Sequence, residues 1–178
     1  MTVHYGNFAV SKGKLIRTIS QDEARDRYEA GIPDAALRPF KVIFGEDPGN
    51  PSVVVEVSSD RRVFTVQWLD DLNRCIGWNV FVPEDKDRGF RQDGRLFLEQ
   101  TRWMEYADGD TQRPPLAQPH AGDGTWFAHD GSWYSTRKIG DDPPEEARGV
   151  MRPEDAARIL WEPTPHFGAW DSLVRRER

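Results

Sequence analysis

Apolar and polar residues alternate most regularly in the middle of the chain. From Val63 to Leu69, every second residue is large and apolar, a period of two that predicts a half-buried strand. The residues expected on its buried side are Phe64, Val66 and Trp68. The preceding run, Ser52 to Val57, is rich in β-branched residues and too apolar for an edge strand with one face in water. With further strands expected at 40–44 and 77–82, and turn-forming clusters between them, the pattern predicts an antiparallel meander.

Shorter signals predict the elements on either side of this meander. Ser20 stands three residues before Glu23, which is a capping-box spacing, and a helix is expected from about Gln21 to Ala30. A second helix is expected from Pro153 to about Trp161, because proline fits a first helical turn and the acids that follow favour a helix N-terminus. The remaining expected elements are a hairpin over 3–10 and 15–18, a strand over 96–106, a long loop over 108–124, a hairpin around Asp130-Gly131, a helical turn over 143–148 and a short final strand or extended segment over 166–170.

These elements together predict an α+β fold. Its centre would be a twisted, mainly antiparallel sheet, with the N-terminal and C-terminal helices packed on one face. The chain has 178 residues, a length typical of one domain. We expect that domain to span 1–172, followed by a charged tail over 173–178.

Charge and composition narrow the function classes. The chain carries 24 basic and 30 acidic residues, a net charge of −6, which argues against a free-standing nucleic-acid binder. No apolar run approaches the ~20 residues of a membrane span, and the N-terminus lacks a signal-peptide pattern. The single cysteine, Cys75, excludes an intramolecular disulfide and is expected to be a buried structural residue. We therefore expect a cytoplasmic protein, monomeric or a small homo-oligomer, that binds neither membrane nor nucleic acid.

The sequence offers little support for catalysis, a cofactor or a metal. None of the four histidines stands in a metal-ligand spacing. Nucleophile-elbow, phosphate-loop, dinucleotide-binding and kinase motifs are absent from the sequence. Two histidines have a nearby acid, His129 with Asp130 and His166 with Asp171, and these pairs could in principle converge. We expect no catalytic residues, no cofactor and no metal site.

Acidic clusters and tryptophans are the candidate partner-binding residues. An acidic face could steer a basic partner, and an exposed tryptophan beside acids is typical of an interface hot spot. Trp126 and Trp133 flank the Asp130-Gly131 turn, where one of them is expected to be exposed, whereas Trp68 and Trp78 are expected in the core. The candidate residues are Glu84, Asp85, Asp87, Trp126, Trp133, Asp141, Asp142, Glu145 and Glu146.

Several stretches resemble a known family. The segment 38–51, rich in Gly, Asp and Pro, is followed by Val53-Val54-Val55-Glu56-Val57 and by 60–64. This order of segments resembles actinobacterial immunity proteins of polymorphic toxin systems, in particular the family often encoded beside nucleic-acid deaminase toxins. The beginning of the chain (3–28) and its ending (151–160, Pro165 and 168–170) are similar to that family as well.

The resemblance implies a small, acidic α+β protein that binds and blocks a cognate protein toxin, without catalytic residues of its own. Two alternatives remain open. One is an enzyme or small-molecule-binding protein with a pocket under the loop 108–124, to which His129, Tyr134 and Glu99 would contribute. The other is a non-catalytic interaction module that has no toxin partner.

Overall fold

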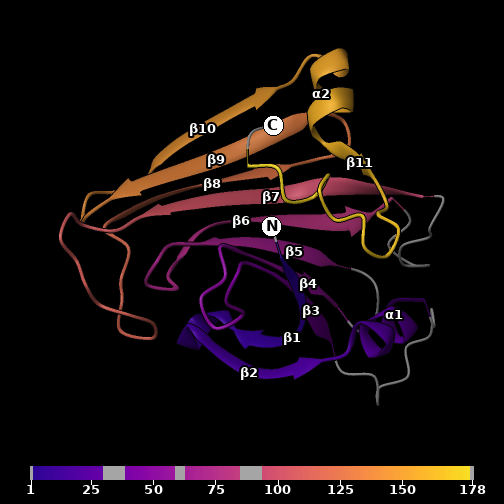
Figure 1. Cartoon of the computed structure of the whole chain (residues 1–178). Helices are drawn as coiled ribbons and strands as arrows, with labels where there is room; N and C mark the ends of the chain where they lie inside the picture. The colour runs from indigo at the N-terminus through magenta and orange to yellow at the C-terminus, as the bar shows by residue number, and fades with distance from the viewer. Residues whose placement is uncertain (1, 30–38, 59–62, 85–93, 177–178) are drawn as a thin grey trace.

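One antiparallel sheet dominates the protein (Figure 1). The computed structural model describes residues 2–29, 39–58, 63–84 and 94–176. Within these ranges, eleven strands are linked in the order β10-β9-β8-β7-β6-β5-β4-β3-β1-β2, and β11 pairs with the beginning of β7. The strands are β1 (Val3–Ala9), β2 (Lys14–Ile19), β3 (Phe40–Phe44), β4 (Val53–Val57), β5 (Phe64–Leu69), β6 (Cys75–Pro83), β7 (Arg95–Glu105), β8 (Ala121–Phe127), β9 (Ser132–Ile139), β10 (Glu145–Val150) and β11 (Trp161–Pro163). The described helices are α1 (Gln21–Glu29), α2 (Pro153–Ile159) and the short 3-10 helix η1 (Val10–Lys12).

The predicted meander is confirmed as β3 to β6. Every strand in it pairs antiparallel with the next, and Val55 of β4 lies between Val42 of β3 and Val66 of β5. The alternation in β5 is also confirmed, because Phe64, Val66 and Trp68 are buried whereas Thr65 and Gln67 are only half-buried. β4 is covered on both faces, as its β-branched run requires: Val55 belongs to the larger core cluster and Val54 to a smaller one.

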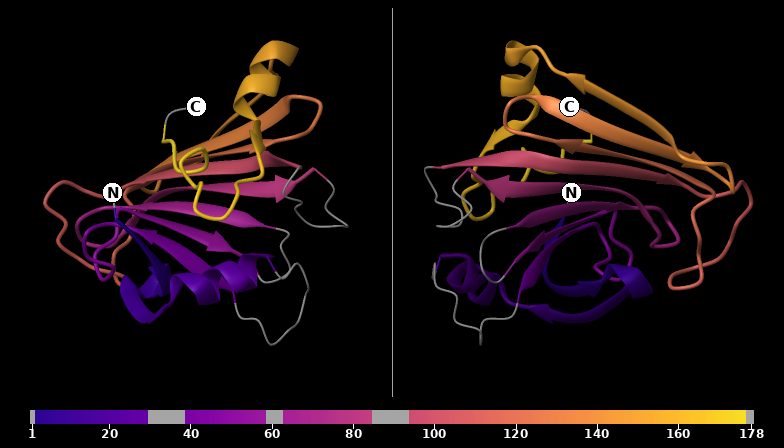
Figure 2. Two further views of the ribbon diagram at one scale, coloured as in Figure 1. Left: turned by 45° about the vertical axis from the view of Figure 1, so that its right-hand side comes forward. Right: turned by 180° about the vertical axis from the view of Figure 1, so that it is seen from behind.

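The larger core lies between the sheet and the C-terminal part of the chain. Trp170 packs edge-on against Tyr28 of α1 with ring centroids 5.2 Å apart, and Phe167 stacks on Tyr5 of β1 at 5.3 Å. Leu173 is fully buried in the same cluster, so the folded part of the chain continues beyond residue 172. Seen from behind, strands β7–β10 lie in front and the C-terminal segment lies beyond them (Figure 2).

Both predicted helices form, and both are short. The amide of Glu23 donates to Ser20 Oγ at 3.1 Å, so Ser20 caps α1 as its spacing predicts. The described residues contain only these two α-helices beside eleven strands, so the protein is mostly sheet.

Three expected elements are wrong. Residues 145–150 form the edge strand β10 and not a helical turn, because their backbone pairs with β9 from Glu145–Arg137 to Val150–Ser132. Residues 121–124 belong to β8 and not to the preceding loop, since they pair with β7 and β9 despite their two glycines. Residues 166–170 form no strand but contain a turn at 167–168, and the last strand is β11.

The prediction that Trp78 lies in the core is also wrong. Phe81 of β6 stands opposite Phe64 of β5, and Asn79, two residues before it, stands opposite Val66, so both face the larger core. Asn79 is therefore buried, with 3% of its surface exposed, and Trp78 is half-buried on the opposite face, where Arg102 lies over its ring. Two faces of one strand are distinguishable only through the neighbouring strands.

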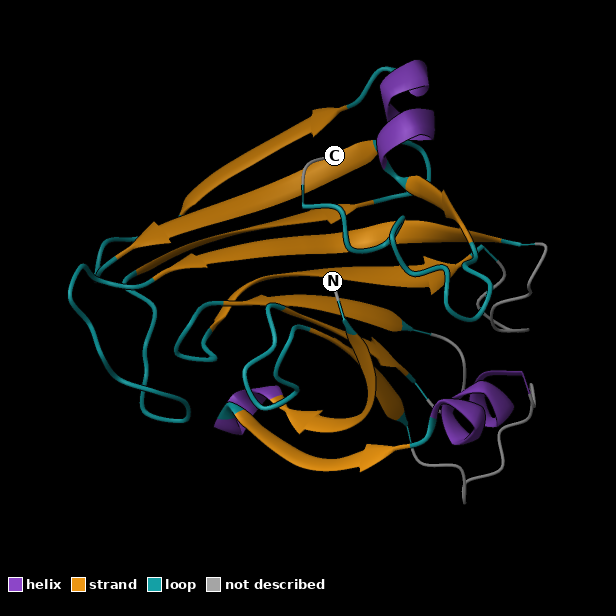
Figure 3. Cartoon of the chain, in the orientation of Figure 1, coloured by secondary structure: helices purple, strands orange, loops and turns teal. Residues whose placement is uncertain are grey.

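The long connection between β7 and β8 is tied to the rest of the fold (Figure 3). Arg74, in the turn after β5, forms ion pairs with Asp70 (Nε–Oδ2, 2.6 Å) and with Asp110 of the connection (Nη1–Oδ2, 3.2 Å). Its guanidinium lies 4.2 Å from the ring centroid of Tyr106. A side chain at Gly13, beside η1, would lie 3.3 Å from Cγ of Pro114 in the same connection. The connection is thus held at both its beginning and its middle.

Candidate functional site

The most exposed tryptophan on the described sheet lies near its C-terminal edge. Trp126 of β8 is 38% exposed, which confirms that one of the two tryptophans beside the turn is exposed. Its ring centroid is 5.8 Å from that of Tyr134, its partner on β9. Tyr134 pairs in turn with Arg148 of β10, whose guanidinium lies 5.5 Å from the tyrosine ring. Arg148 Nη2 also lies 3.9 Å from Glu146 Oε2. We call these four residues the Trp126 surface.

Local sequence helps to place the residues of the Trp126 surface. A Cβ added at Gly124 would lie only 3.2 Å from Cη2 of Trp126, so the absence of a side chain lets the indole lie over its own strand. The hairpin that carries Trp126 and Tyr134 turns at Asp130 and Gly131, as predicted, with Gly131 at φ +82°. Asp130 Oδ1 accepts hydrogen bonds from the amide and the hydroxyl of Ser132, at 2.9 and 2.7 Å, and these bonds lower the pKa of Asp130.

The electrostatics of the Trp126 surface favour a neutral Tyr134. Desolvation is the first cause that raises the pKa of Tyr134, and a hydrogen bond with the carboxylate of Glu146 is the second. The phenol therefore stays protonated at neutral pH and donates to an acid. The surface presents an indole, a phenol, a guanidinium and a carboxylate side by side. It lies at one edge of the sheet, because β10 is the last strand in the order of the described strands.

The predicted partner-binding residues fall into separate groups. Glu146 lies on the Trp126 surface, and Asp141 and Asp142 lie exposed in the turn between β9 and β10. Trp133 immediately precedes Tyr134 in β9 and so points to the opposite face, where it packs against Gly149 of β10. Glu145 points to that same opposite face, as the partner of Arg137.

Glu84 lies at the other end of the sheet from Asp141, where β6 ends and β7 begins (Figure 1). It forms an ion pair with Arg95 at 2.7 Å, and that hydrogen bond lowers its pKa. Asp85 and Asp87 lie outside the described residues. The structure therefore brings Trp126 and Glu146 together and separates Glu84 and Trp133 from them. Sequence reasoning missed Arg148, because only the pairing of β10 with β9 places it on Tyr134.

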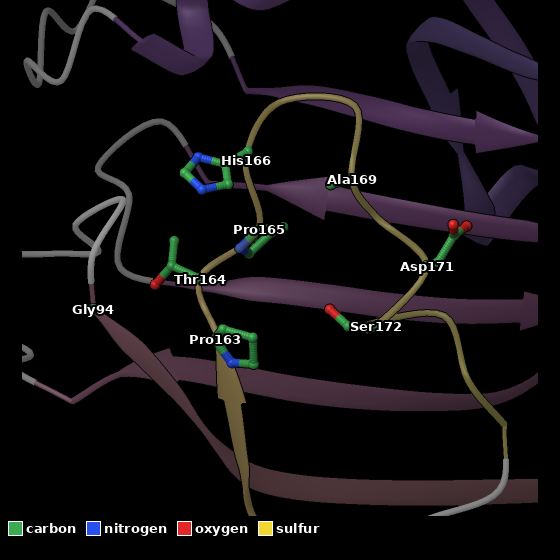
Figure 4. A pocket seen from close by; sticks show the side chains of 8 residues that line it. All are labelled: Gly94, Pro163, Thr164, Pro165, His166, Ala169, Asp171 and Ser172. Atoms are coloured by element: carbon green, nitrogen blue, oxygen red, sulfur yellow. The ribbon is translucent and has the colours of Figure 1, made fainter.

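The predicted histidine–acid pairs do not form a reactive site. His166 and Asp171 line one pocket of about 480 Å³, but they lie on opposite sides of it and point away from each other (Figure 4). The ring of His129 packs against Phe97 at 4.2 Å and Trp161 at 5.4 Å, whereas the carboxylate of Asp130 accepts hydrogen bonds from Ser132. Neither of the two pockets described here is lined by a residue of 108–124.

Cys75 is half-buried and unreactive in character. Burial raises the pKa of its thiol to about 11, and the thiol donates to the carbonyl of Gly77 at 3.4 Å. A thiol with so high a pKa is a poor nucleophile at neutral pH. Across the part of the chain that the structure describes, no three or more His, Cys, Asp and Glu residues gather closely enough to hold a metal ion.

A second pocket, of about 250 Å³, lies on the face of the sheet opposite the Trp126 surface. Its floor is made by Asn79 of β6 and Thr101 of β7, which are cross-strand partners. The other lining residues are Leu98, Trp103, Phe127, Met151, Ile159 and Arg176. We call it the Asn79 groove.

No protein-family model, curated protein or solved structure matches this chain. None of the described helices is long and apolar enough to cross a membrane.

Proposed function

We propose that this protein is an immunity protein that binds a cognate bacterial toxin and blocks it by occupying a surface the toxin needs. The observation that carries the proposal is the Trp126 surface: a tryptophan, 38% exposed, whose ring lies 5.8 Å from that of a tyrosine, beside an arginine of the edge strand β10. Tryptophan, tyrosine and arginine are the residues that most often dominate the binding energy of protein interfaces. The family resemblance of the sequence supports the same function.

The chemistry of this surface favours a protein partner. Its residues lie side by side on β8, β9 and β10, and none of them lines either of the two described pockets, whereas small-molecule sites are concave. The exposed acids at 141–142 and Glu146 would attract a basic toxin surface and speed the encounter. A toxin that acts on nucleic acid must itself bind a polyanion, so an acidic inhibitor can compete for the same basic surface.

Inhibition of this kind needs only tight stoichiometric binding. We take the site of action to be the cytoplasm, with the protein as a monomer or small homo-oligomer. We also take both helices to lie on one face of the sheet, because Tyr28 of α1 and Ile159 of α2 contact the same core. The Trp126 surface would then remain available to the toxin on the other face.

The test is co-expression with the protein encoded immediately upstream. We expect that protein to be toxic alone, to be tolerated when this chain is present, and to co-purify with it as a 1:1 complex. Toxicity that this chain does not relieve, or a non-toxic neighbour that does not bind, would overturn the proposed function.

A further inference from the structure

The Asn79 groove contains a buried polar group that the fold leaves unsatisfied. Asn79 is only 3% exposed, and its Oδ1 has no hydrogen-bond partner. Its neighbours in the sheet are Thr101 on β7 and Val66 on β5, which face the same side. A buried amide oxygen without a donor is uncommon in folded proteins, because its lost hydration is not replaced. A bound group with an N–H or O–H at this position would replace it.

The walls of the groove suit a planar ring. Trp103 and Phe127 both line it, with Leu98 and Ile159 completing an apolar surround. Trp103 is held firmly, since its indole fills the space beside Gly77 and packs 5.1 Å from the ring of Trp68. A volume of about 250 Å³ lies below the usual range for drug-sized ligands, roughly 300–1,000 Å³, so one ring with small substituents is the appropriate size.

The third element of the groove is a cation. Arg176, which is exposed, lines the groove, and its guanidinium lies 5.1 Å from the ring centroid of Trp103. A guanidinium in this position can pair with a carboxylate in two parallel hydrogen bonds. The groove thus combines an acceptor at its floor, aromatic walls and a cation.

We infer that the Asn79 groove binds a small aromatic carboxylate that also carries a hydroxyl or N–H donor on its ring. The carboxylate pairs with Arg176, the ring packs against Trp103 and Phe127, and the donor bonds to Asn79 Oδ1. This inference is independent of the toxin-binding proposal, because the groove lies on the opposite face of the sheet from Trp126.

The experiment uses the full chain and three probes that differ by one group: 4-hydroxybenzoate, benzoate without the donor, and phenol without the carboxylate. Binding is followed by NMR at low salt, which gives both affinity and location. We expect 4-hydroxybenzoate to shift amides of β6 and β7 around the groove and to bind about tenfold more tightly than either of the others, the gain expected from one charge-assisted or buried hydrogen bond.

Arg176→Ala tests the cation, and the structure offers a matched control. Arg102 also lies 5.1 Å from an indole centroid, that of Trp78, but on the opposite face. R176A should weaken 4-hydroxybenzoate binding about tenfold and leave phenol unchanged, whereas R102A should change neither. Equal affinities in the two variants would overturn the inference.

Asn79→Ala tests the acceptor. This variant should bind 4-hydroxybenzoate and benzoate equally, because only the first uses Asn79, while its unchanged affinity for benzoate shows that the groove is intact. If N79A does not fold, the R176A comparison still decides, since Arg176 is exposed.

Two results would overturn the inference. One is that millimolar 4-hydroxybenzoate causes no chemical-shift changes around the groove, and the other is that the changes are confined to other surfaces.

Discussion

Trp103 of β7 occupies the space that a side chain would need at Gly77, its partner on β6. A Cβ added at Gly77 would lie 2.2 Å from Cε3 of the indole, a distance that no two unbonded carbon atoms tolerate. The glycine is the reason that Trp103 can pack beside Trp68 and form a wall of the Asn79 groove. A similar relationship holds between Trp133 and Gly149, where the distance to Cζ2 is 2.7 Å.

Gly77→Ala should destabilise the protein by about 1–3 kcal/mol, the usual cost of overpacking a well-filled site. The measurement is the free energy of unfolding in a chemical denaturant. Gly124→Ala is the matched control, because its Cβ would meet the indole of the exposed Trp126, which has room to move. A G77A variant no less stable than G124A would contradict the account of Trp103.

Trp126→Ala should weaken toxin binding by about 2 kcal/mol or more, roughly a thirtyfold rise in Kd, because hot-spot tryptophans cost that much on truncation. Calorimetric titration of the purified complex gives the value. Leu116→Ala is the control, since Leu116 is 72% exposed but lies in the β7–β8 connection. Equal affinities of the two variants would remove Trp126 from the interface.

The double change Asp141→Lys and Asp142→Lys should slow association with the toxin about tenfold at low salt, with a smaller effect as salt is added, because exposed charges act over a Debye length of about 10 Å at 0.1 M. Stopped-flow kinetics over a salt series measure this. Glu84→Lys changes a comparable exposed acid at the opposite end of the sheet and should leave the rate unchanged. Glu146→Lys is tested in the same way. If neither D141K/D142K nor E146K changed the association rate or the affinity, the acidic residues would have no part in the interface.

Arg74→Ala should destabilise the protein by about 2–3 kcal/mol, because it removes charge-assisted hydrogen bonds to Asp70 and Asp110 from a half-buried site. It should also expose the connection 107–120 to protease, since Arg74 is one of its anchors. Limited proteolysis and denaturant unfolding together measure both effects. Arg113→Ala, at an exposed position in the connection itself, should affect neither strongly.

Cys75 should react slowly with iodoacetamide in the native protein. At pH 8, a thiol whose pKa is about 11 has about a hundredth of the thiolate of one at the ordinary pKa of 9.0. Because the folded-state pKa is raised, the contribution of this thiol to stability is complete below pH 9 and is lost as pH rises towards 11. Alkylation rates of native and unfolded protein test the first statement. The free energy of unfolding, measured between pH 8 and 11, tests the second: it should fall less steeply with pH in a Cys75→Ala variant than in the native protein.

Much of the central sheet was predictable because its signals are local. The apolar alternation in 64–69, the β-branched run in 53–57 and the Asp130-Gly131 turn each specify a backbone conformation through the residues themselves. The same is true of the two helix starts, at Ser20 and Pro153, where a cap and a first-turn proline act within four residues.

The candidate site was less predictable, because it depends on which strands meet. Residues 145–150 carry no strand signal of their own and become extended only by pairing with β9. That pairing places Glu146 and Arg148 beside Tyr134, and Tyr134 beside Trp126. No spacing in the sequence distinguishes this arrangement from one in which Trp133 faces the partner.

The antiparallel meander, the helix starts, the tight hairpin turn and the acidic, aromatic-rich character of the protein can all be inferred from the amino-acid sequence, since each follows from short-range sterics, hydrogen bonding or composition. Three features depend on contacts between distant segments: Asn79 and not Trp78 turns inward, residues 145–150 form β10, and Trp126 and Trp133 lie on opposite faces. Side chains in a strand alternate between two equivalent faces, and the neighbouring strands and the segments packed on them determine which face is buried.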